Sequence, residues 1–258
     1  MCTVLLRLRP GAPWPVLVGA VRDEFVARPW DPPAAHWDGP WAGIVGGRDR
    51  TAGGTWLAVD PDRPALAALL NGPRRPPLDS GARPTRGTLA LEVLTSGAVP
   101  DGDAIADYDA FHLLLATPDG ATVWSWDGEQ RREQAVAPGD HLLVNLGVDT
   151  SEDPLVDHFR PLLAGTTDPA FEADGPLDGW EPWITLLEGD GLDPDDPRAL
   201  LVSREVDGRA YGSTSASLVA LGPEGVRYAF NPLPTDRRAW SLVPLVGPVG
   251  IEPTTQGL

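Results

Sequence analysis

The chain begins MCTVLLRLR (residues 1–9), and we expect this apolar run behind the only cysteine of the 258 residues to decide the fold. Removal of Met1 is usual when the second side chain is small, and it would leave Cys2 with both a thiol and a free α-amino group. An α-amine titrates near pH ~8, so it can accept the thiol proton near neutrality. Cys2 would then supply both the nucleophile and the general base. The alternative is that Cys2 is a small apolar residue at the start of a strand.

A second apolar run at residues 15–21 follows the turn sequence PGAP (residues 10–13), and the two runs predict an antiparallel hairpin. Similar pairs of apolar runs around turn sequences predict hairpins over residues 55–70, 111–126 and 215–230. A further strand is expected at residues 141–145.

Four charged residues come directly after the second run, in the sequence RDEFVAR (residues 22–28). Pairing of the two strands would place Arg22 and Asp23 near Cys2. Asp23 would accept a hydrogen bond from the α-ammonium group, and Arg22 would stabilise the thiolate or a substrate carboxylate. The alternative is a solvated hairpin end with incidental charges.

Helical spacing, with Ser151 or Asp153 as cap, predicts a helix at residues 153–163, and further helices are expected at residues 88–94, 104–108 and 180–187. Residues 26–50 are rich in Pro, Gly, Asp and Trp without periodicity, and we interpret them as a long ordered loop. Hairpins at both ends with helices between them favour an α+β layered fold. We expect one domain over residues 1–245 and a loose tail over residues 246–258.

Composition narrows the function. The net charge is −17, and a surface this acidic repels phosphate backbones, so no nucleic-acid partner is expected. No apolar run approaches the ~20 residues that span a bilayer, and the start lacks a secretory signal, so we expect a cytoplasmic protein. One cysteine excludes a cysteine-cluster metal site, and the four histidines lack metal-ligand spacing, so no metal or other cofactor is expected.

The ordered motifs resemble the NRDE family, also called the transport and Golgi organisation family. The motifs are Cys2, RDEF (residues 22–25) with Arg28-Pro29, and GGTWL (residues 53–57). Weaker matches continue to about Phe230 and comprise Arg86-Gly87, Phe111 to Leu115, Asn145 and Tyr211-Gly212-Ser213. The resemblance therefore covers nearly the whole chain.

The resemblance implies the N-terminal nucleophile hydrolase fold, with four αββα layers and two antiparallel sheets packed face to face. It is similar to the choloylglycine hydrolase and penicillin V acylase branch, in which a cysteine thiolate attacks an amide carbonyl. By this resemblance Cys2 is nucleophile and base, and Arg22 and Asp23 orient the amine and the thiolate. Asn145 donates a hydrogen bond to the oxyanion.

The chain departs from the family pattern where Val21, His112 and Thr214 replace polar residues of the family. We expect these replacements to remove groups that would bind substrate or stabilise an oxyanion. The first functional hypothesis is a cysteine-dependent hydrolase or acyltransferase that acts on an amide or an acyl thioester. The alternative, which the departures favour, is a non-catalytic binding or trafficking protein for haem or a lipid, since family members have been linked to both. A third is an interaction protein that kept the fold and lost the site. The expected partner is thus a small acyl or apolar ligand, and the sequence leaves the oligomeric state open.

Overall fold

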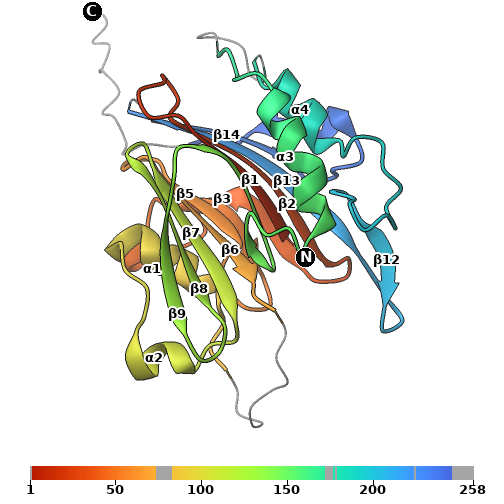
Figure 1. Ribbon diagram of the computed structural model, residues 1–258. Coiled ribbons are helices and arrows are strands. Elements are labelled where there is room, and N and C mark those ends of the chain that lie inside the picture. The colour runs from red at the N-terminus through yellow and green to blue at the C-terminus, as the bar shows by residue number, and fades with distance from the viewer. Residues whose placement is uncertain (1, 74–82, 172–176, 178, 224, 246–258) are drawn as a thin grey trace, which may run out of the picture.

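The computed structural model describes residues 2–73, 83–171, 177, 179–223 and 225–245. Two antiparallel sheets pack face to face, and helices cover the outer face of each sheet (Figure 1). The four layers follow the order αββα, as expected for the N-terminal nucleophile hydrolase fold. The expected tail at residues 246–258 lies outside the described residues.

The first sheet is built around the predicted N-terminal hairpin, in which β1 (Cys2–Leu8) pairs with β2 (Val16–Phe25). Its strand order is β11-β10-β1-β2-β13-β14-β15, and β12 pairs with β13 at the side. The other strands are β10 (Gly139–Val144), β11 (Gly147–Val148), β12 (Ser203–Val206), β13 (Arg209–Gly222), β14 (Gly225–Asn231) and β15 (Ser241–Leu242).

The second sheet is a meander in chain order from β3 to β9. Its strands are β3 (Trp30–Ala34), β4 (Val45–Asp49), β5 (Leu57–Asp60), β6 (Ala65–Asn71), β7 (Phe111–Thr117), β8 (Gly120–Trp126) and β9 (Arg131–Val136). The hairpins expected over residues 55–70 and 111–126 are confirmed as β5-β6 and β7-β8.

The prediction of a long loop over residues 26–50 was wrong, because β3 and β4 lie in it. Two adjacent prolines concealed β3, but it is an edge strand, where the missing N–H groups of proline are tolerated. Two glycines concealed β4. A side chain at Gly47 would overlap the ring of Trp56, so this strand requires glycine to pack.

Four helices cover the sheets in the described part of the chain (Figure 1). They are α1 (Gly87–Ser96), α2 (Gly102–Ala106), α3 (Pro154–Gly165) and α4 (Glu181–Leu187). Asp153 caps α3 by accepting a hydrogen bond from the backbone N–H of Leu155, at 3.1 Å. None of these helices has the length and apolar character needed to cross a membrane.

Alternation along β1 determines where Cys2 lies. Val4, Leu6 and Leu8 face the second sheet, whereas Leu5 faces α3 and α4. Successive side chains of a strand point to opposite faces, so Cys2 shares the face of Val4. Cys2 therefore lies at one end of the apolar layer between the two sheets, where it packs half-buried against that layer.

Candidate active site

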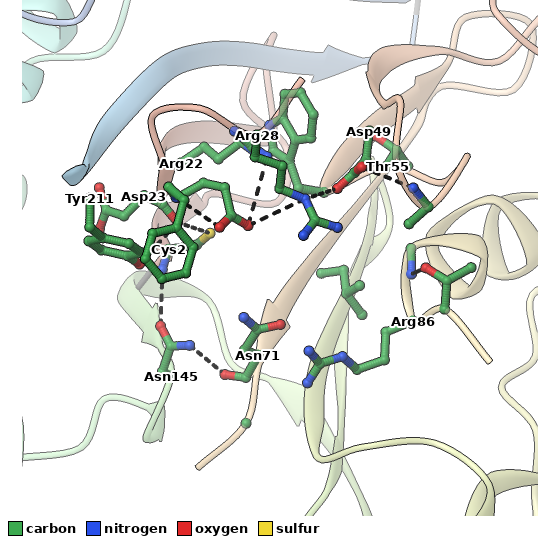
Figure 2. A pocket seen from close by; sticks show the side chains of 18 of the residues that line it. Cys2, Arg22, Asp23, Arg28, Asp49, Thr55, Asn71, Arg86, Asn145 and Tyr211 are labelled. Atoms are coloured by element: carbon green, nitrogen blue, oxygen red, sulfur yellow. Dashed lines mark hydrogen bonds and ion pairs between the residues drawn. The ribbon is translucent and has the colours of Figure 1, made fainter. Parts of the chain in front are cut away.

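A pocket of about 620 Å³ opens where the layer between the sheets ends at Cys2 (Figure 2). Its walls come from the ends of β1 and β2, from β6, from the β12-β13 hairpin and from the residues that precede α1. This volume lies within the range typical of small-molecule sites. The pocket contains all four residues that the sequence singled out: Cys2, Arg22, Asp23 and Asn145.

Asn145 holds the backbone of Cys2. It directly follows β10, which pairs with β1, and its Oδ1 accepts a hydrogen bond from the Cys2 nitrogen at 3.0 Å. Its Nδ2 donates to the carbonyl oxygen of Asn71, at 2.6 Å. The Cys2 nitrogen donates here and the Asn71 oxygen only accepts, so the two partners fix the orientation of the Asn145 amide. Among the described residues, the second N–H of Nδ2 has no acceptor.

Asp23 is held by the strand next to it. Its carboxylate accepts a hydrogen bond from the Ser213 hydroxyl at 2.6 Å, and its carbonyl oxygen accepts one from the Tyr211 hydroxyl at 3.1 Å. The same carbonyl oxygen lies 4.0 Å from Sγ of Cys2. Burial raises the pKa of Asp23 to about 6, partly offset by nearby positive charge and by the Ser213 hydrogen bond.

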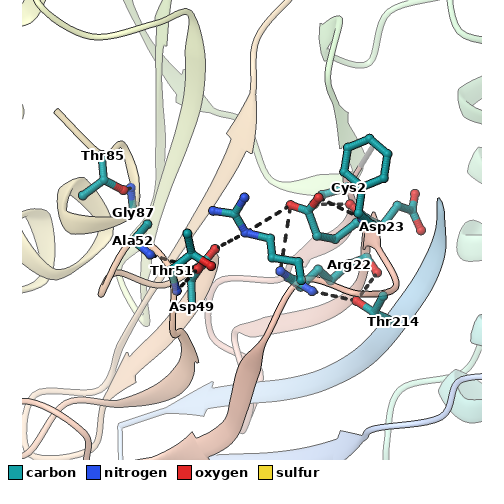
Figure 3. Close-up of polar contacts among 12 residues, drawn as sticks. Cys2, Arg22, Asp23, Asp49, Thr51, Ala52, Thr85, Gly87 and Thr214 are labelled. Atoms are coloured by element: carbon teal, nitrogen blue, oxygen red, sulfur yellow. Dashed lines mark hydrogen bonds and ion pairs between the residues drawn. The ribbon is translucent and has the colours of Figure 1, made fainter. Parts of the chain in front are cut away.

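Arg22 lies directly opposite Cys2 across the β1-β2 ladder and is only 4% exposed. Its guanidinium stacks over the ring of Trp56, 4.3 Å from the ring centroid. Nη1 donates to the Thr214 hydroxyl at 2.8 Å, and that hydroxyl also lies 3.2 Å from the Arg22 carbonyl oxygen (Figure 3). Nη2 of Arg22 also lies 3.9 Å from a carboxylate oxygen of Glu24, at the limit of an ion pair.

Two of the three departures from the family pattern support the site. The strand register shifts between Ser213 and Ser215, and Thr214 occupies this bulge against Arg22. His112 donates to or accepts from the Ser125 hydroxyl at 2.7 Å through Nδ1, and its Nε2 lies 3.2 Å from the Asn145 carbonyl oxygen. Both replacements thus make polar contacts with residues of the site. The third departure, Val21, is an apolar core residue.

The family motif residues that sequence reasoning left without a role join the two sheets. Arg28 donates through Nε to Asp49 of β4 at 2.6 Å, and it lies 3.8 Å from Glu24 of β2. Asp49 in turn accepts from the backbone N–H groups of Thr51 and Ala52 (Figure 3). This network fixes the loop between β4 and β5 against the mouth of the pocket.

Gly54 and Gly87 allow the backbone of that loop to contact the backbone at the start of α1 directly. A side chain on Gly54 would overlap the backbone of Gly87, and the Thr55 N–H donates to the Gly87 carbonyl at 3.0 Å. Glycine is required here for close approach rather than for an unusual backbone angle. The GGTW motif is therefore a structural element of the pocket wall.

The thiol needs a base before it can act as a nucleophile. Burial raises the pKa of the Cys2 thiol, so the neutral form is favoured. Burial also lowers the pKa of Arg22, which nevertheless supplies positive charge beside the thiol. A free α-amine on Cys2 would lie on the same residue as the thiol and at the nitrogen that Asn145 holds. The arrangement can thus support nucleophilic attack if that amine is free.

Comparison with known proteins agrees with this geometry. A family model described as "Transport and Golgi organisation 2" matches residues 1–166. Among solved structures, the fold is similar to that of a Caenorhabditis elegans N-acylethanolamine-hydrolyzing acid amidase ortholog. The TM-score is 0.50 and the identity 11%, and the match covers 94% of this chain and 100% of that chain. At this identity the likeness shows the fold alone. No curated protein matches the chain at the same level of significance.

Proposed function

Since the chain belongs to the Transport and Golgi organisation 2 family and has the N-terminal nucleophile hydrolase fold, we propose that it is a cysteine-dependent hydrolase or acyltransferase. The substrate class is an amide or an acyl thioester. One observation carries the proposal: Asn145 holds the Cys2 nitrogen at 3.0 Å while the Cys2 side chain lines an open pocket.

The reaction begins with the loss of Met1, which frees the α-amine of Cys2. The amine takes the proton of Sγ, and the thiolate attacks the substrate carbonyl carbon, so that an S–C bond forms and a pair of C=O electrons moves to oxygen. The C–N or C–S bond then breaks, and the protonated amine returns the proton to the leaving group. Water or another acceptor then attacks the acyl carbon, the S–C bond breaks, and the proton of the acceptor passes through the amine to Sγ, which restores the thiol. The acceptor is water in a hydrolase and another nucleophile in an acyltransferase.

The neighbouring residues stabilise the charges that this sequence creates. Asp23, whose carbonyl oxygen lies 4.0 Å from Sγ, would stabilise the α-ammonium form of Cys2, and Arg22 would stabilise the thiolate. The second N–H of Asn145 Nδ2 donates to the oxyanion, a contribution of about 3 kcal/mol where single donors have been removed from other enzymes.

A matched set of acyl donors tests the proposal. N-Octanoyl amides and octanoyl thioesters are incubated with the wild type, Cys2→Ala and Cys2→Ser, and release of octanoate is measured. We expect turnover by the wild type only, or a much slower reaction of Cys2→Ser, because the hydroxyl is a weaker nucleophile. Equal rates for the wild type and Cys2→Ala would exclude Cys2 as the nucleophile.

A non-catalytic carrier is the second candidate, and the raised pKa of the buried Cys2 thiol favours it. With Met1 retained, the Cys2 nitrogen belongs to a peptide bond and cannot serve as the base. Haem is the less favoured cargo, since the described residues that line the pocket include no histidine to ligate the iron. Titration with haemin tests this form of the candidate: a saturable Soret shift in the wild type supports it, and its absence contradicts it.

A further inference from the structure

Arginines without a carboxylate partner gather at the pocket. In the part of the chain that the structure describes, most arginines lie within 4 Å of a carboxylate oxygen, as expected for a protein with a net charge of −17. The exceptions are Arg86, Arg204, Arg209 and Arg227. The first three line the pocket, and Arg227 does not.

From this distribution we propose that the pocket takes an acyl compound that carries an oxyanion group, either a carboxylate or a phosphate. Arg204 and Arg209 would bind this group from one side and Arg86 from the other. The acyl part of the ligand rests on the function proposed above, whereas the anionic part rests only on the positions of the arginines.

The acidic residues of the pocket do not cancel these charges. Glu24 and Asp49 contact Arg28, and Glu24 also lies near Arg22. The Asp23 carboxylate accepts a hydrogen bond from the neutral Ser213 hydroxyl and lies in the electrostatic field of Arg22 and Arg204, so it offsets only part of the positive charge. Among the described residues that line the pocket, five arginines face three acidic residues, which leaves a local positive charge in an acidic protein. Such a cleft concentrates anionic ligands.

The β12-β13 hairpin holds its two arginines on aromatic rings. Arg204 lies opposite Tyr211 in the strand register and 5.6 Å from its ring centroid, and Arg209 lies 3.8 Å from the ring centroid of Phe25. The two rings themselves meet edge to face at 5.4 Å. Stacking of this kind orders a guanidinium while it leaves the N–H groups free for an oxyanion.

This stacked row is tied directly to the Cys2 site. The hydroxyl of Tyr211 donates to the Asp23 carbonyl oxygen at 3.1 Å, and that oxygen lies 4.0 Å from the Cys2 thiol. A ligand held by Arg204 and Arg209 is thereby placed close to the nucleophile.

Arg86 approaches from the opposite wall (Figure 2). It immediately precedes α1, and its Nη1 donates to the Ala110 carbonyl oxygen at 2.7 Å, which fixes the side chain at the pocket. Its remaining N–H groups have no carboxylate within salt-bridge distance among the described residues. Cys2 thus lies in a pocket with cationic groups on both sides.

Binding to the full-length Cys2→Ala variant separates recognition from chemistry. The first pair of probes is octanoyl-4′-phosphopantetheine and octanoyl-pantetheine, which share a thioester and differ only in the phosphate. The second pair is N-octanoylglycine and N-octanoylglycinamide, which differ only in a carboxylate. Dissociation constants are measured by calorimetry at about 50 and about 300 mM salt, because salt screens exposed charges.

We expect the anionic member of at least one pair to bind about tenfold tighter or better at low salt, with a smaller preference at high salt. The pair that shows the preference identifies the group as phosphate or carboxylate. The double variant Arg204→Gln/Arg209→Gln loses most of the preference, and Arg86→Gln loses part of it. Arg227→Gln is the matched control, because Arg227 also stacks on aromatic rings, those of Trp14 and Phe171, but does not line the pocket. We expect this variant to keep the preference for the anionic probe.

Equal binding of both members in both pairs would overturn the proposal, as would a preference that the double variant leaves unchanged. Circular dichroism of each variant shows that it is folded. The wild type is assayed for turnover of the same probes. An anion preference without turnover supports this inference and contradicts the proposed chemistry, and turnover without a preference has the opposite meaning.

Discussion

The backbone nitrogen of Cys2 donates to Oδ1 of Asn145 at 3.0 Å, across 143 positions of the sequence. Because the same amide donates to the Asn71 carbonyl, Asn145 ties the first strand of one sheet to the end of β6 in the other. The nucleophile that we propose is therefore positioned by both sheets. The nitrogen in this hydrogen bond is the one that would serve as the base after removal of Met1.

Two substitutions at Asn145 separate its two contacts. Asn145→Asp keeps an oxygen for the Cys2 nitrogen but loses the Nδ2 donor, whereas Asn145→Ala loses both. If Asn145 serves the oxyanion, we expect both variants to lower kcat by about 100-fold or more with little change in KM. Steady-state kinetics with the best octanoyl donor measure this. An Asn145→Asp variant with normal kcat would limit Asn145 to holding the Cys2 nitrogen.

The raised pKa of Asp23 makes a prediction about stability. Its pKa in the folded state is about 6, against 3.8 for an ordinary aspartate, so the folded state disfavours the ionised form. The resulting destabilisation develops as the pH rises from about 4 to about 6 and is complete above that range, where it amounts to at most about 3 kcal/mol. Asparagine does not ionise. Asp23→Asn is therefore expected to gain stability relative to the wild type across this range, while it loses activity.

Urea unfolding of the wild type and Asp23→Asn at pH 4, 5, 6 and 7 measures the difference. Ser213→Ala serves as a second variant, because it removes the hydrogen bond but keeps the carboxyl group. A difference between Asp23→Asn and the wild type that stays constant over the pH series would show that Asp23 does not titrate in this range.

Arg22 should control the reactivity of the thiol. Its positive charge lowers the pKa of Cys2, so Arg22→Gln is expected to raise that pKa and slow alkylation at pH 8. Arg22→Lys, which keeps a charge, should restore part of the rate. Since Cys2 is the only cysteine, the iodoacetamide reaction reports on it alone. Arg48 pairs with Asp31 away from the thiol, so Arg48→Gln is the control. If Arg22→Gln and Arg48→Gln slowed alkylation equally, Arg22 would have no local role.

The crossing of Gly54 and Gly87 should be intolerant of even one methyl group. Gly54→Ala would overlap the Gly87 backbone and is expected to cost about 1–3 kcal/mol of unfolding free energy and to disturb the pocket wall. Gly165→Ala, at the end of α3 with open space around it, should be neutral or slightly stabilising. Thermal unfolding of the two variants tests the difference. Equal midpoints would show that the crossing adjusts easily.

Local sequence patterns were sufficient for much of the fold. Alternation and turn residues predicted the β1-β2 hairpin, and the Asp153 cap with its helical spacing predicted α3. The patterns failed for the interior strand β4, which two glycines concealed, and for the edge strands β3 and β9. β9 carries mostly exposed polar residues, and β3 contains two prolines, so neither shows the apolar alternation of a buried strand.

The site was predicted less completely. Cys2, Arg22, Asp23 and Asn145 carried recognisable motifs, and the structure brings them to one pocket. Asn71 contributes only a backbone carbonyl oxygen to that arrangement, and its residue type carries no signal for such a role. Arg204 and Arg209 lie in a segment with little alternation of polar and apolar residues. Only the pairing of β12 with β13 places them at the pocket.

The intact mass of the purified protein, before and after exposure to octanoyl donors, tests the central proposal most directly. We expect a protein without Met1 that gains one octanoyl group, and no adduct on Cys2→Ala. A protein that retains Met1, or a processed protein that forms no adduct with any amide or thioester donor, would contradict the proposal that Cys2 is an N-terminal nucleophile.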